Sequence, residues 1–170
     1  MAQPDFTQTV LLALSNAREQ AQQSSSVYVG TEHILLGLLQ TDDVELINTL
    51  HHFDVDPTEL TRTTLKFIQD GRAEISHDDR KRYVEMGRMR GSGEIDTRAS
   101  HTMPMPDTPY SAAARKALVD TGEVADVMKV EEIGTVHLLA ALIKENDNLA
   151  AQALSEHELD YDKLLQLLKG

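Results

Sequence analysis

The 170-residue sequence contains no cysteine and no tryptophan, and aromatic residues make up only 4% of it. Without cysteine the chain has no disulfide, no thiolate nucleophile and no cysteine-bound zinc, so nothing indicates an oxidising compartment. A cytoplasmic location is therefore expected. Hydrophobic residues still make up 41% of the chain, which predicts a core built chiefly from Leu, Val, Ile and Ala.

Two further absences concern membranes and nucleic acids. The sequence shows no basic segment followed by an apolar stretch at its start and no run of about 18 apolar residues, so no membrane association is predicted. There are 28 acidic and 16 basic residues, and the formal net charge of −12 repels phosphate groups. Nucleic acids are therefore not expected as partners, whereas basic protein surfaces are favoured.

Patterns typical of catalytic and metal-binding sites are also absent. The sequence contains no Gly-x-x-x-x-Gly-Lys-Ser/Thr phosphate loop and no His-Glu-x-x-His zinc motif. The adjacent His51 and His52 have no third ligand at helical spacing. We therefore expect a chain that is not an enzyme, with no catalytic residues, no metal site and no cofactor.

The main positive feature is an internal repeat. Residues 6–66 align without a gap onto residues 110–170 at a constant offset of 104, and thirteen of these positions are identical. The strongest correspondence lies between two four-residue motifs, Gly30-Thr31-Glu32-His33 and Gly134-Thr135-Val136-His137. Because an ungapped match of this length is improbable by chance, a duplication explains it better.

Each copy of the repeat contains four segments with helical periodicity, so eight helices and an all-α fold are predicted. The first segment, for example, has its apolar face at Val10, Leu14, Ala17 and Ala21. Residues that favour helix caps precede the eight segments: Thr7, Thr31, Asp43, Asp56, Ser111, Thr135, Asp147 and Asp160. No segment alternates apolar and polar residues between turn signals, so no sheet is expected.

The two copies are expected to form one globular domain, with repeat 1 at residues 1–70 and repeat 2 at residues 110–170. Each copy has an apolar face that the other must cover. Residues 71–109 are interpreted as a flexible linker, because glycine, proline and mixed charge interrupt any apolar pattern there. A short helix is predicted inside it, between Asp78 and Arg90.

The segment from Gly30 to Leu39 resembles the N-terminal repeat of the Clp/Hsp100 unfoldases, and the whole chain is similar to ClpC-type N-domains in particular. The resemblance covers both repeats, about three quarters of the chain, and rests on the motif, the duplication and the spacing. It implies a pseudo-twofold bundle that binds substrates and adaptors and passes clients to an ATPase ring, which threads them into a protease. Since the phosphate loop is missing, the chain is either part of a longer unfoldase or a free-standing Clp-N protein.

The resemblance implies two alternative functions. In the first, the chain recruits protein clients or adaptors, including clients tagged with phosphoarginine, to a Clp unfoldase and protease. In the second, it is an accessory subunit that docks on Clp ATPase or protease subunits and regulates their assembly without holding clients. Two features depart from the family pattern: the linker is much longer than usual, and Val136 replaces one of the two glutamates that grip the guanidinium of phosphoarginine in some members.

Five residues are candidates for ligand or substrate binding under this resemblance: Thr7, Thr31, Glu32, Ser111 and Thr135. A carboxylate in the first turn of a helix can accept from a guanidinium, while nearby amides attract a phosphate. The alternative is that Thr31 and Glu32 merely start a helix, which both residue types favour. For His33 and His137, which lie one turn before apolar residues, packed and hydrogen-bonded side chains are expected rather than ligands.

Overall fold

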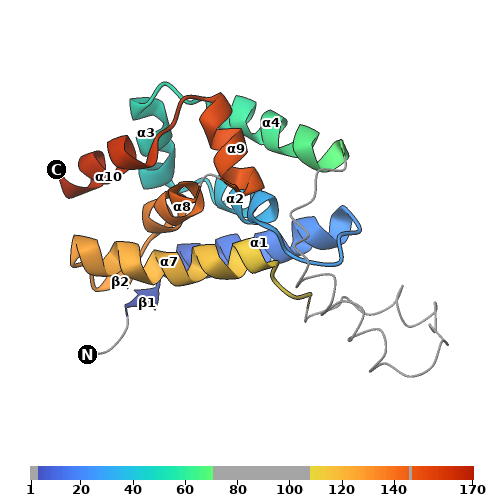
Figure 1. Ribbon diagram of the computed structural model, residues 1–170, viewed down its shortest axis with the longest axis horizontal. Coiled ribbons are helices and arrows are strands. Elements are labelled where there is room, and N and C mark those ends of the chain that lie inside the picture. The colour runs from blue at the N-terminus through green and yellow to red at the C-terminus, as the bar shows by residue number, and fades with distance from the viewer. Residues whose placement is uncertain (1–3, 71–107, 146) are drawn as a thin grey trace.

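The computed structural model describes residues 4–70, 108–145 and 147–170. Repeat 1 contains β1 (Asp5–Phe6), α1 (Gln8–Gln23), α2 (Thr31–Leu39), α3 (Val44–His52) and α4 (Pro57–Gln69). Repeat 2 contains α7 (Ala112–Met128), β2 (Glu132–Ile133), α8 (Thr135–Lys144), α9 (Leu149–Glu156) and α10 (Tyr161–Lys169) (Figure 1). The eight predicted helices are therefore present in the described part of the chain. The short helix predicted between Asp78 and Arg90 lies outside the described residues.

The offset of 104 between the repeats holds in the backbone as well as in the sequence. Three of the four helix pairs, α1 and α7, α2 and α8, and α4 and α10, begin at equivalent residues. Left-handed backbone conformations recur at equivalent turns: φ is 56° at Ser25 and 57° at Lys129, and 58° at Asp54 and 61° at Glu158. The repeats therefore share the same turns after their first and third helices.

Most of the predicted helix starts are confirmed. Five of the predicted residues accept a hydrogen bond from an N–H group in the first turn that follows them: Thr7, Asp43, Asp56, Ser111 and Asp160. The predicted cap of α9 is wrong by one residue. Asn148, rather than Asp147, precedes the helix, and its Oδ1 accepts from the Ala151 N–H at 2.7 Å.

The expectation of a fold without strands is wrong in one detail. β1 and β2 pair in parallel over two residues each, and an isolated parallel bridge joins Val29 to Tyr110. Both pairs join the segment before the first helix of one repeat to the segment before the second helix of the other. Two residues are too few to produce a visible alternation, so no pattern in the sequence could have revealed these strands.

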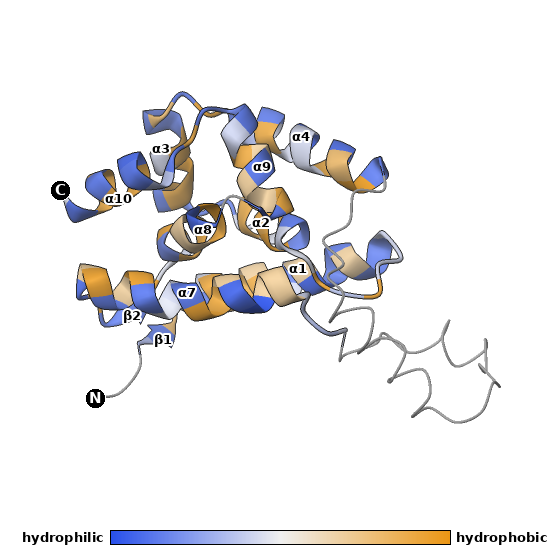
Figure 2. Ribbon diagram, in the orientation of Figure 1, coloured by the Kyte–Doolittle hydropathy of each residue, from blue (hydrophilic) through white to orange (hydrophobic). Residues whose placement is uncertain are grey.

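One hydrophobic core runs through both repeats. α2 and α8 lie in the middle of the molecule, with α1 and α7 on one side and α3, α4 and α9 on the other (Figure 1). Both central helices carry many hydrophobic residues (Figure 2). Every residue from 31 to 38 in α2 is buried, as is every residue from 135 to 143 in α8. Buried apolar residues of both repeats belong to a single, mainly aliphatic cluster. Among the described residues, no helix is long and apolar enough to cross a membrane.

α1 and α2 approach each other closely because a glycine lies at their contact. A Cβ atom on Gly37 would lie 2.2 Å from the Ala13 carbonyl oxygen and 2.8 Å from the Ala17 nitrogen, which is nearer than a carbon atom can come. In repeat 2 the equivalent residue is Ala141, so α7 and α8 accommodate a methyl group at the same place. Gly37 is therefore a packing requirement of repeat 1 alone.

Candidate functional site

The five candidate residues fall into two corners of the molecule that the repeat relates to each other. The Thr7 N–H donates to the Ile133 carbonyl oxygen at 3.0 Å, which brings the start of α1 to the start of α8. The Ser111 N–H donates to the Val29 carbonyl oxygen at 2.9 Å, which brings the start of α7 to the start of α2. The Thr7 corner thus holds Thr7 and Thr135, and the Ser111 corner holds Ser111, Thr31 and Glu32.

The starts of α2 and α8 differ from the predicted ones. The residues that precede these helices are Gly30 and Gly134, both with extended backbone at φ of −91°. Thr31 and Thr135 are therefore the first helical residues rather than caps, and that prediction is wrong. A glycine cap has no side chain to accept from the first-turn amides, so the histidine three residues later takes part in capping instead.

The two motif histidines are buried and hydrogen-bonded, as expected. His33 Nδ1 accepts from the Gly30 N–H at 3.0 Å, so the proton sits on Nε2, which donates to Ser24 Oγ at 3.2 Å. His137 Nδ1 accepts from the Gly134 N–H at 2.8 Å. Burial lowers the pKa of His33 to about 4 and also lowers the pKa of His137, so both rings are neutral at pH 7.

Each motif threonine connects its own repeat to the third helix of the other repeat. Thr31 Oγ1 accepts from the Ala150 N–H, in the first turn of α9, at 3.1 Å. Thr135 Oγ1 donates to Oδ2 of Asp43, the cap of α3, at 2.6 Å. Both threonines are buried. Each hydroxyl group thus contacts the start of the third helix of the other repeat, Thr31 as an acceptor and Thr135 as a donor.

The other two candidate hydroxyl groups act as helix caps. Thr7 Oγ1 accepts from the Val10 N–H at 3.3 Å, and Ser111 Oγ accepts from the Ala114 N–H at 3.1 Å. Thr7 is half-buried, whereas Ser111 is fully buried. Each cap leaves its helix start beside the motif of the opposite repeat.

Glu32 distinguishes the Ser111 corner from the Thr7 corner. The residue is only 2% exposed, and its carboxyl group folds back over Gly30, where an added Cβ would lie 2.2 Å from Oε2. Oε1 lies 3.6 Å from His33 Nδ1, an atom that already accepts a hydrogen bond. Val136 occupies the equivalent position with 1% exposure. The two corners therefore differ by one buried carboxyl group.

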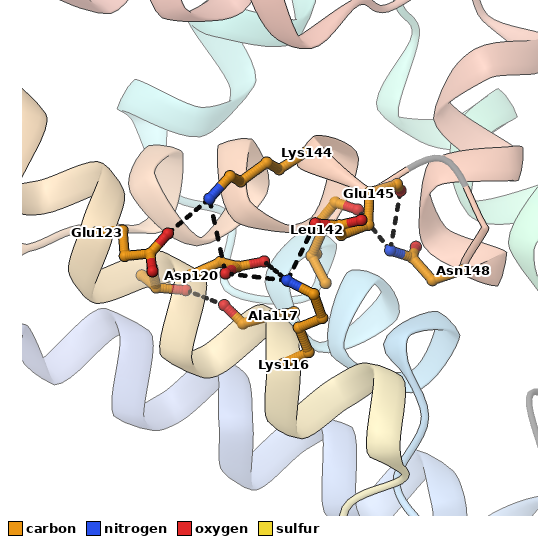
Figure 3. A network of polar contacts seen from close by, with 9 residues as sticks. Lys116, Ala117, Asp120, Glu123, Leu142, Lys144, Glu145 and Asn148 are labelled. Carbon is orange, nitrogen blue, oxygen red and sulfur yellow. Dashed lines mark hydrogen bonds and ion pairs between the residues drawn. The ribbon is translucent and has the colours of Figure 1, made fainter. Parts of the chain in front are cut away.

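An ion-pair network that the sequence did not reveal joins α7 to α8 (Figure 3). Lys116 Nζ lies 3.1 Å from Asp120 Oδ2 and 3.0 Å from Glu145 Oε1. Lys144 Nζ lies 2.7 Å from Glu123 Oε2 and 3.6 Å from Asp120 Oδ1. Hydrogen bonds to Glu145 and Asp120 raise the pKa of Lys116, and the bond to Glu123 raises that of Lys144. Only the spacing of Lys116 and Asp120 could have signalled this network.

A shallow groove of about 310 Å³ lies beside this network, between α7 and the loop that joins α8 to α9. Four alanines and four polar residues line it: Ala112, Ala113, Ala117, Ala141, Lys116, Glu145, Asp147 and Asn148. The Asn148 side chain donates to the carbonyl oxygens of Leu142 and Glu145, so it shapes the loop. Within the described ranges, no group of three or more His, Asp or Glu side chains is placed to hold a metal ion.

The Ser111 corner contains a second contact that the sequence did not reveal. The guanidinium carbon of Arg18 lies 5.5 Å from the centre of the Tyr110 ring, a cation–π contact between α1 and the residue just before α7's cap. The equivalent residues in the Thr7 corner are Gly122 and Phe6. The Thr7 corner therefore has the ring without the cation.

Comparison with known proteins identifies the family. The sequence matches the Clp repeat (R) N-terminal domain over residues 5–84 and 109–170. The chain belongs to the Clp repeat (R) N-terminal domain family. The resemblance drawn from the motif and the duplication is thereby confirmed.

The relatives of this Clp repeat domain are much longer than the chain itself. It is 29% identical over 159 residues to the ClpA homolog of Cyanidium caldarium and 24% identical over 158 residues to ClpC of Staphylococcus saprophyticus, both named ATP-dependent Clp protease ATP-binding subunits. The alignments cover 94% and 93% of the chain but only 15% and 16% of those proteins. The Hsp104 N-terminal domain from Candida albicans has the same fold, with a TM-score of 0.64 at 15% identity, over 96% of this chain and 89% of that domain.

Proposed function

We propose that this Clp repeat domain recruits protein clients or adaptors to a Clp-type unfoldase and protease. The observation that supports this most directly is the coverage of the match: almost the whole chain aligns with a small part of ATP-dependent Clp subunits. A domain that accounts for 15–16% of such a subunit leaves the ATP-binding machinery elsewhere. This share supports a role in binding for the domain.

The surface of the described residues supports a role in protein binding. Several large apolar side chains are exposed, among them Leu12 (51%), Val44 (69%) and Val119 (67%). The chain is also strongly acidic, with a formal net charge of −12. Exposed apolar side chains and a negative net charge favour partners that present both apolar and basic residues.

A chimaera tests the proposal. This chain would replace the N-domain of a ClpC-type unfoldase, and the degradation of a panel of clients by the assembled protease would be measured beside a ring that lacks any N-domain. We expect the chimaera to degrade at least some clients faster than the truncated ring. Equal rates would contradict client recruitment, and a chimaera that changes only ring assembly would favour the accessory-subunit alternative.

We extend the proposal to clients tagged with phosphoarginine, bound at the Ser111 corner. Glu32 provides the carboxyl group that can pair with the guanidinium, and Ser111 lies at the start of a helix whose positive end favours a phosphate. Because Glu32 is buried, binding requires its side chain to turn outward from Gly30. Val136 provides no such group in the Thr7 corner.

Titration calorimetry with a phosphoarginine-bearing peptide tests this extension. We expect one site in the parent chain, at least about tenfold weaker binding in Glu32→Ala, and a second site in Val136→Glu, since a charge-assisted hydrogen bond contributes about 1.5–3 kcal/mol. Two equivalent sites in the parent, or unchanged affinity in Glu32→Ala, would mean that the motif serves only to start a helix.

A further inference from the structure

Equivalent aromatic rings have different neighbours in the two corners. In the Ser111 corner, the guanidinium of Arg18 stacks over the Tyr110 ring at 5.5 Å. In the Thr7 corner, the equivalent ring is Phe6 and the residue in place of Arg18 is Gly122. A Cβ atom added to Gly122 would meet no other atom within 4 Å. No atom therefore blocks the start of a side chain at Gly122, the position from which Arg18 reaches Tyr110 in the other corner.

Phe6 and Gly122 correspond by the repeat to Tyr110 and Arg18, which are in contact, and the neighbours of Gly122 on α7 are apolar on one side and acidic on the other. Val119, 67% exposed, lies one turn before Gly122 on the same face of α7, and the exposed Asp126 lies one turn after it. Phe6 is only half-buried, and its strand β1 pairs with β2, which packs against α7 (Figure 1). We call Phe6, Val119, Gly122 and Asp126 the Phe6 site.

The charges near the Phe6 site point to a cation from outside the chain. Asp5 and Glu132 are both exposed and lie side by side in the parallel strand pair, where like charges destabilise each other. Within the described ranges, no basic side chain forms an ion pair with Asp5, Glu132 or Asp126. The equivalent residues in the Ser111 corner are uncharged: Pro109, Tyr28 and Gln22. At these three positions, negative charge occurs in the corner without a cation of its own and not in the corner that contains Arg18.

We propose that the Phe6 site binds an unmodified arginine side chain from a basic segment of a partner protein. The partner's guanidinium takes the place over Phe6 that Arg18 takes over Tyr110, its aliphatic stem lies on Val119, and its N–H groups donate to the Asp126 carboxylate. This deepens the proposed function, on which it rests, by giving the chemistry of the client segment. It is separate from the Glu32 proposal, because a phosphate on the guanidinium would be repelled by the carboxylates at this site.

The test is a titration of the 170-residue chain, followed by NMR, with a capped Gly-Arg-Gly peptide. The matched control is the same peptide with citrulline, which keeps the shape of arginine and removes its charge. We expect saturable shifts at the Phe6 ring and the Gly122 amide with the arginine peptide, and binding weaker by about tenfold with citrulline. Added salt should weaken the arginine complex, since the site is open to solvent.

Three variants place the binding at the Phe6 site. Gly122→Arg supplies the chain's own cation and should abolish binding, and Phe6→Leu keeps an apolar side chain and should weaken binding about tenfold. Arg18→Ala is the matched change in the corner where Pro109, Tyr28 and Gln22 carry no charge, so it should leave binding at the Phe6 site unchanged. Circular dichroism checks that each variant is folded. If Gly122→Arg does not fold, the binding measured with Phe6→Leu tests the proposal instead.

Equal binding of the arginine and citrulline peptides, or undiminished binding in Gly122→Arg, would overturn the proposal. Tighter binding of a phosphoarginine peptide at the same resonances would overturn it too. The client-degradation chimaera is a separate measurement, so loss of peptide binding with intact client delivery would reject the Phe6 site alone. Peptide binding without client delivery would instead reject the recruiting function.

Discussion

Two glycines inside helices show how one residue type can have opposite effects on stability. We expect Gly37→Ala to lower the free energy of unfolding by about 1–3 kcal/mol, because the new methyl group would overlap the backbone of α1 at Ala13 and Ala17. Gly122→Ala should raise it by roughly 0.5–1 kcal/mol, because no atom lies within 4 Å and alanine favours the helix. Urea unfolding of the two variants beside the parent measures both effects. A change of the same sign in both would contradict this account.

The buried His33 makes stability depend on pH. Its pKa is about 4 in the folded chain and ordinarily 6.5, so between these values the unfolded chain takes up a proton that the folded chain refuses. The stability that the neutral His33 allows is fully present above pH 6.5 and is lost as the pH falls toward 4. We expect this residue alone to remove roughly 3 kcal/mol between pH 7 and pH 4.

The matched variant for this prediction is His33→Gln. Glutamine keeps an oxygen that can accept from the Gly30 N–H but does not titrate. Urea unfolding at pH 7, 5.5 and 4 should therefore show a shallower loss of stability in the variant than in the parent. Parallel losses in the two proteins would mean that His33 takes up its proton without unfolding the chain.

The contact between the motif helices and the third helices can be tested at Thr31 and Thr135. Thr31→Val leaves the buried Ala150 N–H without its acceptor and should cost about 1–3 kcal/mol of stability. Thr135→Val should cost about 1 kcal/mol, because Asp43 keeps its bond from the Leu46 N–H at 3.1 Å.

A control for this pair is Thr61→Val, since the Thr61 hydroxyl donates only to the Pro57 carbonyl oxygen within α4, at 2.8 Å. We expect that variant to unfold within about 0.5 kcal/mol of the parent. Chemical unfolding of all three at pH 7 gives the comparison. If Thr31→Val is no more damaging than Thr61→Val, the contact between the repeats contributes little.

At the level of the elements, local sequence patterns predicted most helix starts, whereas the contacts between the repeats could not be predicted from the sequence. Helix starts such as Thr7, Asp43 and Asp56 were predictable because a cap acts on amides two or three residues away. The glycine caps of α2 and α8 were missed because the capping group is a histidine inside the helix. The strand pairs escaped prediction because their partners lie far apart in the sequence.

The candidate site shows the same limit more strongly. The motif identified Thr31 and Glu32, but nothing local indicated that the Thr31 hydroxyl bonds to α9 or that Glu32 is buried. Likewise, Arg18 and Tyr110 are separated by most of the chain, so their contact depends on how the two repeats pack. The repeat nevertheless held the useful signal: comparing equivalent positions exposes the unmatched ring at Phe6.

The architecture of the whole molecule makes each repeat depend on the other. Residues 31–38 of α2 and 135–143 of α8 are all buried, and the two helices pack against each other, so each repeat covers part of the other's second helix. The strand pair and the isolated bridge both cross between the repeats, as do the hydrogen bond from the Ala150 N–H to Thr31 and the hydrogen bond between Thr63 and His157. Stabilising contacts therefore cross between the copies as well as lying within each of them.

We therefore expect peptides spanning residues 1–70 and 108–170 to be largely unfolded when studied separately. Each would expose the central helix and the apolar face that the other repeat buries, and a chain of this length gains little from its own core. Mixing the two should restore helical circular dichroism at a rate that rises with concentration, because folding then requires association. If either peptide folds alone with a cooperative transition as stable as that of the parent chain, the repeats are independent domains, and the contacts through Thr31 and the strand pairs are not needed to hold the fold.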